Sequence, residues 1–548
     1  MGIATPSQGS RRWPADLRFW IVLSVFLFAV SAFCSHFGLF GQFRTTTFGV
    51  SYSAIWDPGG PYLASGTLLY RTDKASFYGH PGLFLQTGAA LLGEGSYFIA
   101  TRIFDCSASY PRFIAKNCYW FILVGKLIMT ACHLLWLYLL SRICARFWTD
   151  RLTTHVAILA CLTTFPVLYY LNTISPEPIL ITWVLTALLL AWKWADDRQA
   201  GRSPRAWAWF ALSALACAGA CCSKFMFGVP ATVAVSLYYV IESKTALSRM
   251  RRVLLPPVFL ILCALLVIAL SQKVDWRAFF VHWRHYTAGL SDHPAWSPHP
   301  AANEGLVAKA TAVLRSAATI LRPTLSLSHW LPARSPHGLL CAAEIAFVPV
   351  ALVGTFLMLR RLEENRRQFW SILLVVICIA PIVIYKDYYN YYILPLALAS
   401  IPFAYVLTTV FRSVLKTRVS RTLQWAILAA AVGVIHLPSI IIIADAKLGD
   451  IQMYRWYHQC YFTGLRRISY DQRIGLTEAN LDMAKVLGFD YRTDPEILKE
   501  AIRSFFYAIP PGMPYDRLPD DVVFVVERRT LTPVPDRPTH APVEGDGS

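Results

Sequence analysis

The chain has 548 residues, of which 55% are hydrophobic and only 15% are charged, and its formal net charge is +18. A soluble domain of this size carries about 25% charged residues, so the composition excludes a water-soluble protein. The basic excess does not indicate nucleic-acid binding, because the basic residues are dispersed among connections that a membrane topology explains.

Runs of about 20 apolar residues recur along the sequence, which is the length that crosses a hydrocarbon core roughly 30 Å thick. Backbone polar groups inside lipid must be paired within the segment, so each span is expected to be a helix. The predicted fold is an all-α polytopic membrane protein with about eleven transmembrane helices. These spans are 19–40, 117–140, 152–171, 179–195, 207–222, 225–241, 253–271, 338–359, 369–385, 391–411 and 422–444.

Basic residues gather in every second connection between the predicted spans. The five basic connections contain Arg142, Arg146 and Arg151; Arg198, Arg202 and Arg205; Lys244, Arg249, Arg251 and Arg252; Arg360, Arg361, Arg366 and Arg367; and Arg412, Lys416, Arg418 and Arg421. The positive-inside rule places these connections in the cytoplasm. We therefore expect a multi-pass protein of a bacterial inner membrane, with its N-terminus cytoplasmic and its C-terminus periplasmic.

Three regions follow from this topology. Residues 1–444 form the transmembrane domain, with large outer loops at 41–116 and 272–337 that carry juxtamembrane helices; residues 445–531 form a periplasmic C-terminal region, and 532–548 a disordered tail. The apolar stretch 82–93 is too short to span and is expected to lie at the interface or against the bundle. Cys106 and Cys118 leave two possibilities open, a disulfide in an oxidising compartment or two unpaired thiols.

The stretch 56–62, with sequence WDPGGPY, puts one carboxylate into a Pro/Gly-rich turn just past the first span. In the simpler interpretation Asp57-Pro58 only initiates a turn. In the functional interpretation Asp57 is a candidate for chemistry, because charged residues near membrane depth are costly. Lys224 and Lys386 stand out for the same reason, as the basic residues of the short outer connections.

The order of several motifs resembles the integral-membrane glycosyltransferases of the GT-C class, in particular the bacterial branch related to protein O-mannosyltransferases and the aminoarabinose transferase. The motifs are Asp57, Tyr62, LLYR at 68–71 and HPG at 80–82; NTISPEP at 172–178; CSK at 222–224; and KDYYNYYILP at 386–395. The resemblance covers residues 15–445. Many members carry a paired Asp-Glu where this chain has Asp57-Pro58, which puts the metal or base role of such a pair in doubt.

The resemblance implies transfer of a sugar from a polyprenyl-phosphate donor to a lipid, glycan or protein acceptor on the periplasmic side. Asp57 would act as general base, and Lys224, Arg71 and Lys386 would bind the donor phosphate. Expected substrate-binding residues are Tyr62, His80, Glu177, His285, Tyr388 and Tyr389. No cofactor or metal ligand is expected, although a divalent metal is possible. Membrane lipids are the other expected partners.

Simpler interpretations stay open for these residues. Lys224 could extend to an interface, Glu177 could be a solvated loop acid, and the tyrosines could belong to an aromatic belt. Two other functions also stay open. A secondary transporter would need ionisable or unwound helix sites near the bilayer midplane. A polysaccharide polymerase or ligase would place its catalytic residues in the 272–337 loop.

Overall fold

The computed structural model describes most of the predicted transmembrane domain. The described residues are 17–40, 66–67, 69–70, 82–108, 110–148, 150–171, 173–242, 249–274, 276–277, 279–280, 347–363, 365–386, 389–415, 420, 423–424, 426–433, 466–468 and 473–475.

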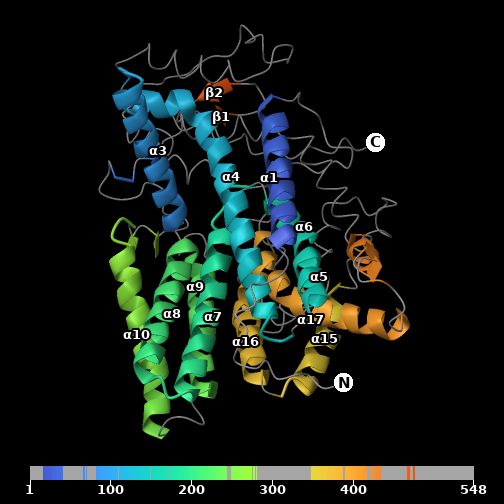
Figure 1. Cartoon of the computed structure of the whole chain (residues 1–548). Coiled ribbons are helices and arrows are strands. Elements are labelled where there is room, and N and C mark those ends of the chain that lie inside the picture. The colour runs from blue at the N-terminus through green and yellow to red at the C-terminus, as the bar shows by residue number, and fades with distance from the viewer. Residues whose placement is uncertain are drawn as a thin grey trace, which may run out of the picture.

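The described part of the chain is helical, apart from one short antiparallel hairpin (Figure 1). The helices are α1 (Leu17–Phe40), α3 (Leu83–Ile103), α4 (Tyr110–Cys144), α5 (Arg151–Leu162), α6 (Phe165–Tyr170), α7 (Glu177–Gln199), α8 (Ser203–Ser223), α9 (Phe225–Glu242), α10 (Arg249–Leu270), α15 (Phe347–Arg361), α16 (Arg366–Lys386) and α17 (Tyr389–Leu415). The hairpin pairs β1 (Arg466–Ile468) with β2 (Arg473–Gly475).

Seven of the described helices contain a stretch that is long and apolar enough to cross a membrane. These stretches are Leu123–Cys144, Glu177–Gln199, Ser203–Ser223, Phe225–Glu242, Val253–Leu270, Arg366–Val383 and Ile393–Ser413, and each overlaps a predicted span. The predicted span 19–40 falls on α1, in which Leu17–Ala32 is a shorter apolar helix. The predicted span 338–359 is described only from Phe347, where α15 begins, and 422–444 only as far as 433. The total of eleven stays a prediction.

The predicted span 152–171 is two helices instead of one. α5 ends at Leu162, and α6 begins after an extended residue, Thr164, with a proline in its first turn. Pro166 has no N–H to donate to the preceding turn, so the helix cannot continue without a break. With 12 residues, α5 is about 18 Å long and does not cross a hydrocarbon core by itself.

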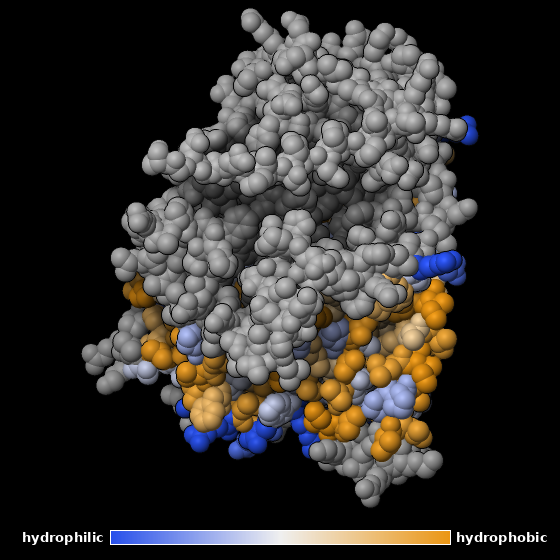
Figure 2. Space-filling view, turned by 180° about the vertical axis from the view of Figure 1, so that it is seen from behind, coloured by the Kyte–Doolittle hydropathy of each residue, from blue (hydrophilic) through white to orange (hydrophobic). Residues whose placement is uncertain are grey.

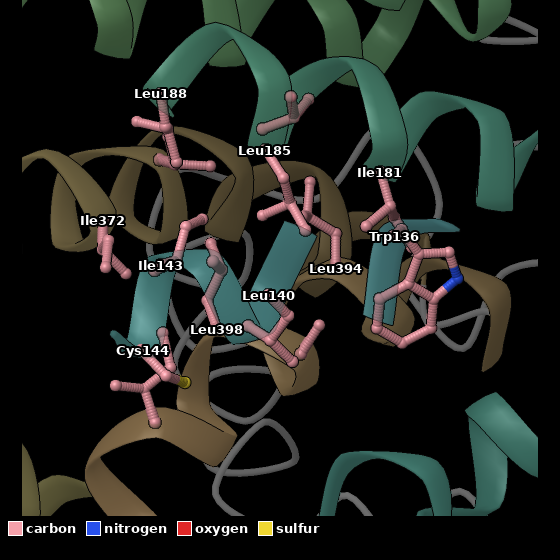
Figure 3. Packing of buried hydrophobic residues seen from close by; sticks show 14 of the residues in the cluster. Trp136, Leu140, Ile143, Cys144, Ile181, Leu185, Leu188, Ile372, Leu394 and Leu398 are labelled. Carbon is pink, nitrogen blue, oxygen red and sulfur yellow. The ribbon is translucent and has the colours of Figure 1, made fainter. Parts of the chain in front are cut away.

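The core lies where α4, α7, α16 and α17 meet. Figure 3 shows Trp136 of α4 beside Ile181 of α7. Buried side chains from the next turns of both helices follow, and Leu394 and Leu398 of α17 belong to the same cluster. Small residues bring other helices close together, as is usual in membranes. On α8, a Cβ added at Gly219 would lie 2.7 Å from the Trp183 ring.

The described residues of the five basic connections lie at one end of the bundle, as the charge pattern predicts. Arg146 pairs with Asp196 at 2.6 Å, and the Asn365 amide donates to the Arg146 carbonyl at 2.7 Å. Arg367 pairs with Glu242, and a third ion pair joins Arg412 to Asp150. We call this end the basic end. Figure 2 shows an apolar surface on the described part, with hydrophilic residues along one edge. Which side of the membrane this end faces stays a prediction.

Candidate functional site

A buried ion pair closes the opposite end of the bundle, which we call the Lys224 end. α7 begins at Glu177, α8 ends at Ser223 and α9 begins at Phe225. The Lys224 ammonium donates a hydrogen bond to the Glu177 carboxylate across 47 positions of sequence. Their side chains are 1% and 3% exposed. Two residues that the sequence identified separately therefore form one site.

Backbone hydrogen bonds hold Lys224 between α8 and α9. Lys224 is extended (φ −150°, ψ 94°) between α8 and α9. Its N–H donates to the Ala220 carbonyl at 3.0 Å, and its carbonyl accepts from the N–H groups of Phe227 and Gly228. Because both neighbouring helices are tied to this one residue, its position between them is well defined. The ammonium also lies 5.8 Å from the centre of the Phe227 ring, within cation–π range.

The carboxylate partner is placed by the start of α7. Glu177 lies in the first turn of the helix, where the unpaired N–H groups favour a negative charge. A proline also lies in this turn, where its missing N–H costs nothing. An isolated charge would be very costly in this dry environment, so each partner makes the burial of the other possible. The interpretations of Lys224 as an interface residue and Glu177 as a solvated loop acid are therefore wrong.

The chain on the far side of the Asp57 loop packs directly beside this ion pair. The N–H of Gly82, from the HPG motif, donates to the carbonyl of Ser223 at 3.1 Å. Gly82 precedes α3 in the left-handed conformation (φ 44°), which favours glycine. Leu69, from the LLYR motif, lies in a buried cluster with Leu83 and Cys222. Parts of three predicted motifs thus meet at one place, and Figure 1 shows α3 above α8.

Most of the other predicted site residues cannot be placed. Asp57, Tyr62, Arg71, His80, His285 and Tyr388 lie outside the described residues. The backbones of Lys386 and Tyr389 end α16 and begin α17, but their side chains also lie outside the description. Cys106 is a free thiol, and the side chain of Cys118 is not described.

One buried cation was missed by the sequence prediction. Lys126 lies on α4 near the start of its candidate span and is 8% exposed. Among the lysines and arginines whose side chains are described, Lys126 and Lys224 are the buried ones. The signal was present in the sequence, because a single lysine inside an apolar run is a functional candidate by default.

Metal binding finds no support within the described residues. No three His, Cys, Asp or Glu side chains there come together in a way that could hold a metal ion. The buried cysteines of α8 and α10 are free thiols in a largely apolar environment, where cysteine behaves as a small hydrophobe.

The chain matches no protein-family model and no curated protein sequence. Similar solved structures include the archaeal oligosaccharyltransferase AglB from Archaeoglobus fulgidus, in complex with an inhibitory peptide and a dolichol-phosphate (TM-score 0.41, 15% identity, covering 79% of this chain and 56% of that chain). Another is the arabinosyltransferase EmbB from Mycobacterium smegmatis (TM-score 0.42, 13% identity, 84% and 44%). The chain spans about half the length of these solved chains. With TM-scores below 0.5, these likenesses assign neither family nor function.

Proposed function

We propose that this protein is a membrane glycosyltransferase. It would move a sugar from a polyprenyl-phosphate donor to an acceptor at the periplasmic face of a bacterial inner membrane. The observation that carries the proposal is the buried Lys224–Glu177 pair, at the end opposite the basic connections and beside the residues that follow the Asp57 loop. Charged groups buried at membrane depth are functional candidates, and the charge pattern favours the outer side for this end.

The side of the membrane determines the class of donor. Nucleotide sugars are confined to the cytoplasm, so a transferase that works at the outer face needs a sugar carried across on a lipid. A polyprenyl phosphate provides this carrier. Its phosphate already bears negative charge and gains more as it leaves, so it must be neutralised by cations. Lys224, Arg71 and Lys386 are the residues we assign to this role.

Lys224 can contact a phosphate only after it releases Glu177, because the ammonium is enclosed in this structure. We therefore propose an exchange of partners in which the donor phosphate takes the place of the Glu177 carboxylate. The lysine stays paired throughout, which avoids the large cost of an uncompensated buried charge. Glu177 would then turn toward the substrates, together with Tyr62 and His80.

Asp57 would act as the general base. It takes the proton from the acceptor hydroxyl while the hydroxyl oxygen bonds to the anomeric carbon of the sugar. The bond from that carbon to the phosphate oxygen breaks, and polyprenyl phosphate leaves. His285, Tyr388 and Tyr389 are assigned to the sugar and acceptor. The apolar contacts of α3 with Leu69 and Cys222 would exclude water that could hydrolyse the donor.

The test is a transfer assay with the full chain in lipid nanodiscs and a panel of radiolabelled polyprenyl-phosphate sugars. Wild type should consume one of them, and Asp57→Asn should lower kcat by about 10²–10⁴-fold. Asp105→Asn is the matched control, because Asp105 is an exposed acid in the same outer loop and should keep wild-type activity. Full activity of Asp57→Asn would exclude its role as base. Consumption of diphosphate-linked glycans alone would favour the polymerase or ligase alternative.

A further inference from the structure

Lys126 belongs to a buried polar stripe on α4 that the proposed reaction does not yet use. Lys126, Thr130 and His133 stand at positions i, i+4 and i+7, so they share one face of the helix. All three are buried, and toward the basic end the same face continues with the buried side chains of Leu140 and Cys144. This face of α4 is therefore polar toward the Lys224 end and apolar toward the basic end.

The depth of Lys126 follows from the alignment of α4 with α7. Both helices run from the Lys224 end to the basic end, and Trp136 lies beside Ile181 in Figure 3. Glu177 is about one turn before Ile181 on α7. On α4, the position about one turn before Trp136 is Cys132, so Glu177 and Cys132 lie at about the same height along the bundle. At a rise of about 1.5 Å per residue, Lys126 lies about 9 Å further toward the Lys224 end. It is therefore near the outer boundary of the bundle.

The chain on both sides of the Asp57 loop is held by α4. Before the loop, the Thr130 hydroxyl donates to the Ser31 hydroxyl of α1 at 2.8 Å. After the loop, the Tyr110 hydroxyl donates to the Thr67 carbonyl at 2.5 Å. Lys126 lies on α4 between these two attachment points. Described residues before and after the Asp57 loop are therefore attached to α4 on either side of this lysine.

A lysine in this place is costly unless it serves an anion. Lys126 interacts with the rest of the chain in this structure and, like Lys224, is a buried cation. We propose that Lys126 binds the phosphate of the lipid-borne donor, and of the polyprenyl phosphate product, on the face of α4 that leads to the Lys224 end. The proposal rests on the glycosyltransferase function above and adds a phosphate-binding residue to it.

Binding of a lipid phosphate can be measured without knowing the sugar. The full chain in neutral phosphatidylcholine nanodiscs is heated with farnesyl phosphate, farnesol or inorganic phosphate, and Kd is derived from the shift in Tm. Wild type should be stabilised by farnesyl phosphate and by neither control. Lys126→Met should weaken this binding about tenfold or more, and Lys126→Arg should keep most of it. The matched control is Lys193→Met at the exposed Lys193, which lies near the Trp209 ring toward the basic end and should bind as wild type does.

The outcomes separate this proposal from the one that it rests on. If wild type distinguishes farnesyl phosphate from farnesol but Lys126→Met binds like wild type, the role of Lys126 is excluded and the proposed function stands. If wild type does not distinguish the two lipids, both proposals fail. If inorganic phosphate stabilises wild type as well as farnesyl phosphate does, the site takes a free anion and the lipid assignment is wrong. Lys126→Gln, which keeps a polar side chain, replaces Lys126→Met if that variant does not fold.

Discussion

The two ends of the bundle both carry ion pairs but bury them to very different degrees. At the basic end, the Arg146 and Asp196 side chains are 32% and 41% exposed, whereas those of Lys224 and Glu177 are 1% and 3% exposed. Water screens the partly exposed pairs, so each of them contributes little to the free energy of unfolding and either partner can be replaced. The Lys224–Glu177 pair is buried away from water, so removing one partner alone leaves an uncompensated charge. The partners at the basic end can therefore be replaced one at a time, whereas the proposed exchange of anions concerns a pair at the Lys224 end that is stable only when complete.

The largest effect is expected from removing one member of the dry pair. Lys224→Met leaves the Glu177 carboxylate buried without its cation and should lower the free energy of unfolding by roughly 3–5 kcal/mol. Adding Glu177→Gln should restore much of the loss. Unfolding of the detergent-solubilised protein, followed by circular dichroism, measures both variants.

The matched cycle at the basic end is Arg146→Met with Asp196→Asn. These partly exposed residues should couple by about 1 kcal/mol or less. If the losses at the Lys224 end simply add, the two residues are not coupled and the contrast between the ends is wrong.

A smaller effect is expected where α9 begins, next to Lys224. A Cβ added at Gly228 would overlap the backbone of Cys221 on α8, so Gly228→Ala must push the two helices apart. We expect a loss of about 1–3 kcal/mol, because overpacking a close helix contact is costly. In α3, a Cβ at Gly88 would meet nothing within 4 Å, so Gly88→Ala should be neutral or stabilise by up to about 1 kcal/mol. Equal thermal stability of the two variants would contradict the close approach.

The sequence predicts the helices and the basic end of the bundle better than it predicts which side chains from different helices meet. Apolar length alone located the seven candidate spans, and loop charge located the basic end, because both properties are local. Glu177 and Lys224 were each identified, but their pairing depends on how α7 and α8 pack and leaves no local signal. Lys126 was overlooked because the apolar run around it dominates its window. The division of span 152–171 was missed although Pro166 indicates it.

At the basic end, Asp150 should make stability depend on pH. It caps α5, accepting hydrogen bonds from the N–H groups of Leu152 and Thr153, and it pairs with Arg412. Burial raises the pKa of Asp150, but the hydrogen bonds from Thr153 and the charge of Arg412 outweigh burial and hold the pKa below its usual range. A depressed pKa in the folded state adds stability above about pH 4, which is lost as the pH falls through the folded-state pKa.

Two variants of Asp150 separate the cap from the charge. Asp150→Ala removes both and should lose about 1 kcal/mol at pH 7, whereas Asp150→Asn keeps a good cap and should lose less. Thermal unfolding between pH 3 and 7 checks this, and the difference between wild type and Asp150→Asn should shrink below about pH 4. A constant difference across this range would show that the charge of Asp150 contributes nothing.

The smallest effect is expected from Arg205, whose side chain is 62% exposed. Without it, Asp197 keeps Arg202 at 3.0 Å and the Trp209 indole N–H at 2.9 Å. Arg205→Ala should therefore change the free energy of unfolding by no more than about 0.5 kcal/mol.

Measuring the same variants at high salt tests the difference in burial between the two ends. In 1 M salt the Debye length is about 3 Å, so the effect of Arg205→Ala should vanish while that of Lys224→Met persists, because salt does not reach a buried pair. If both effects fall together, water enters the Lys224 end, and its lysine needs no exchange of partners to meet a phosphate.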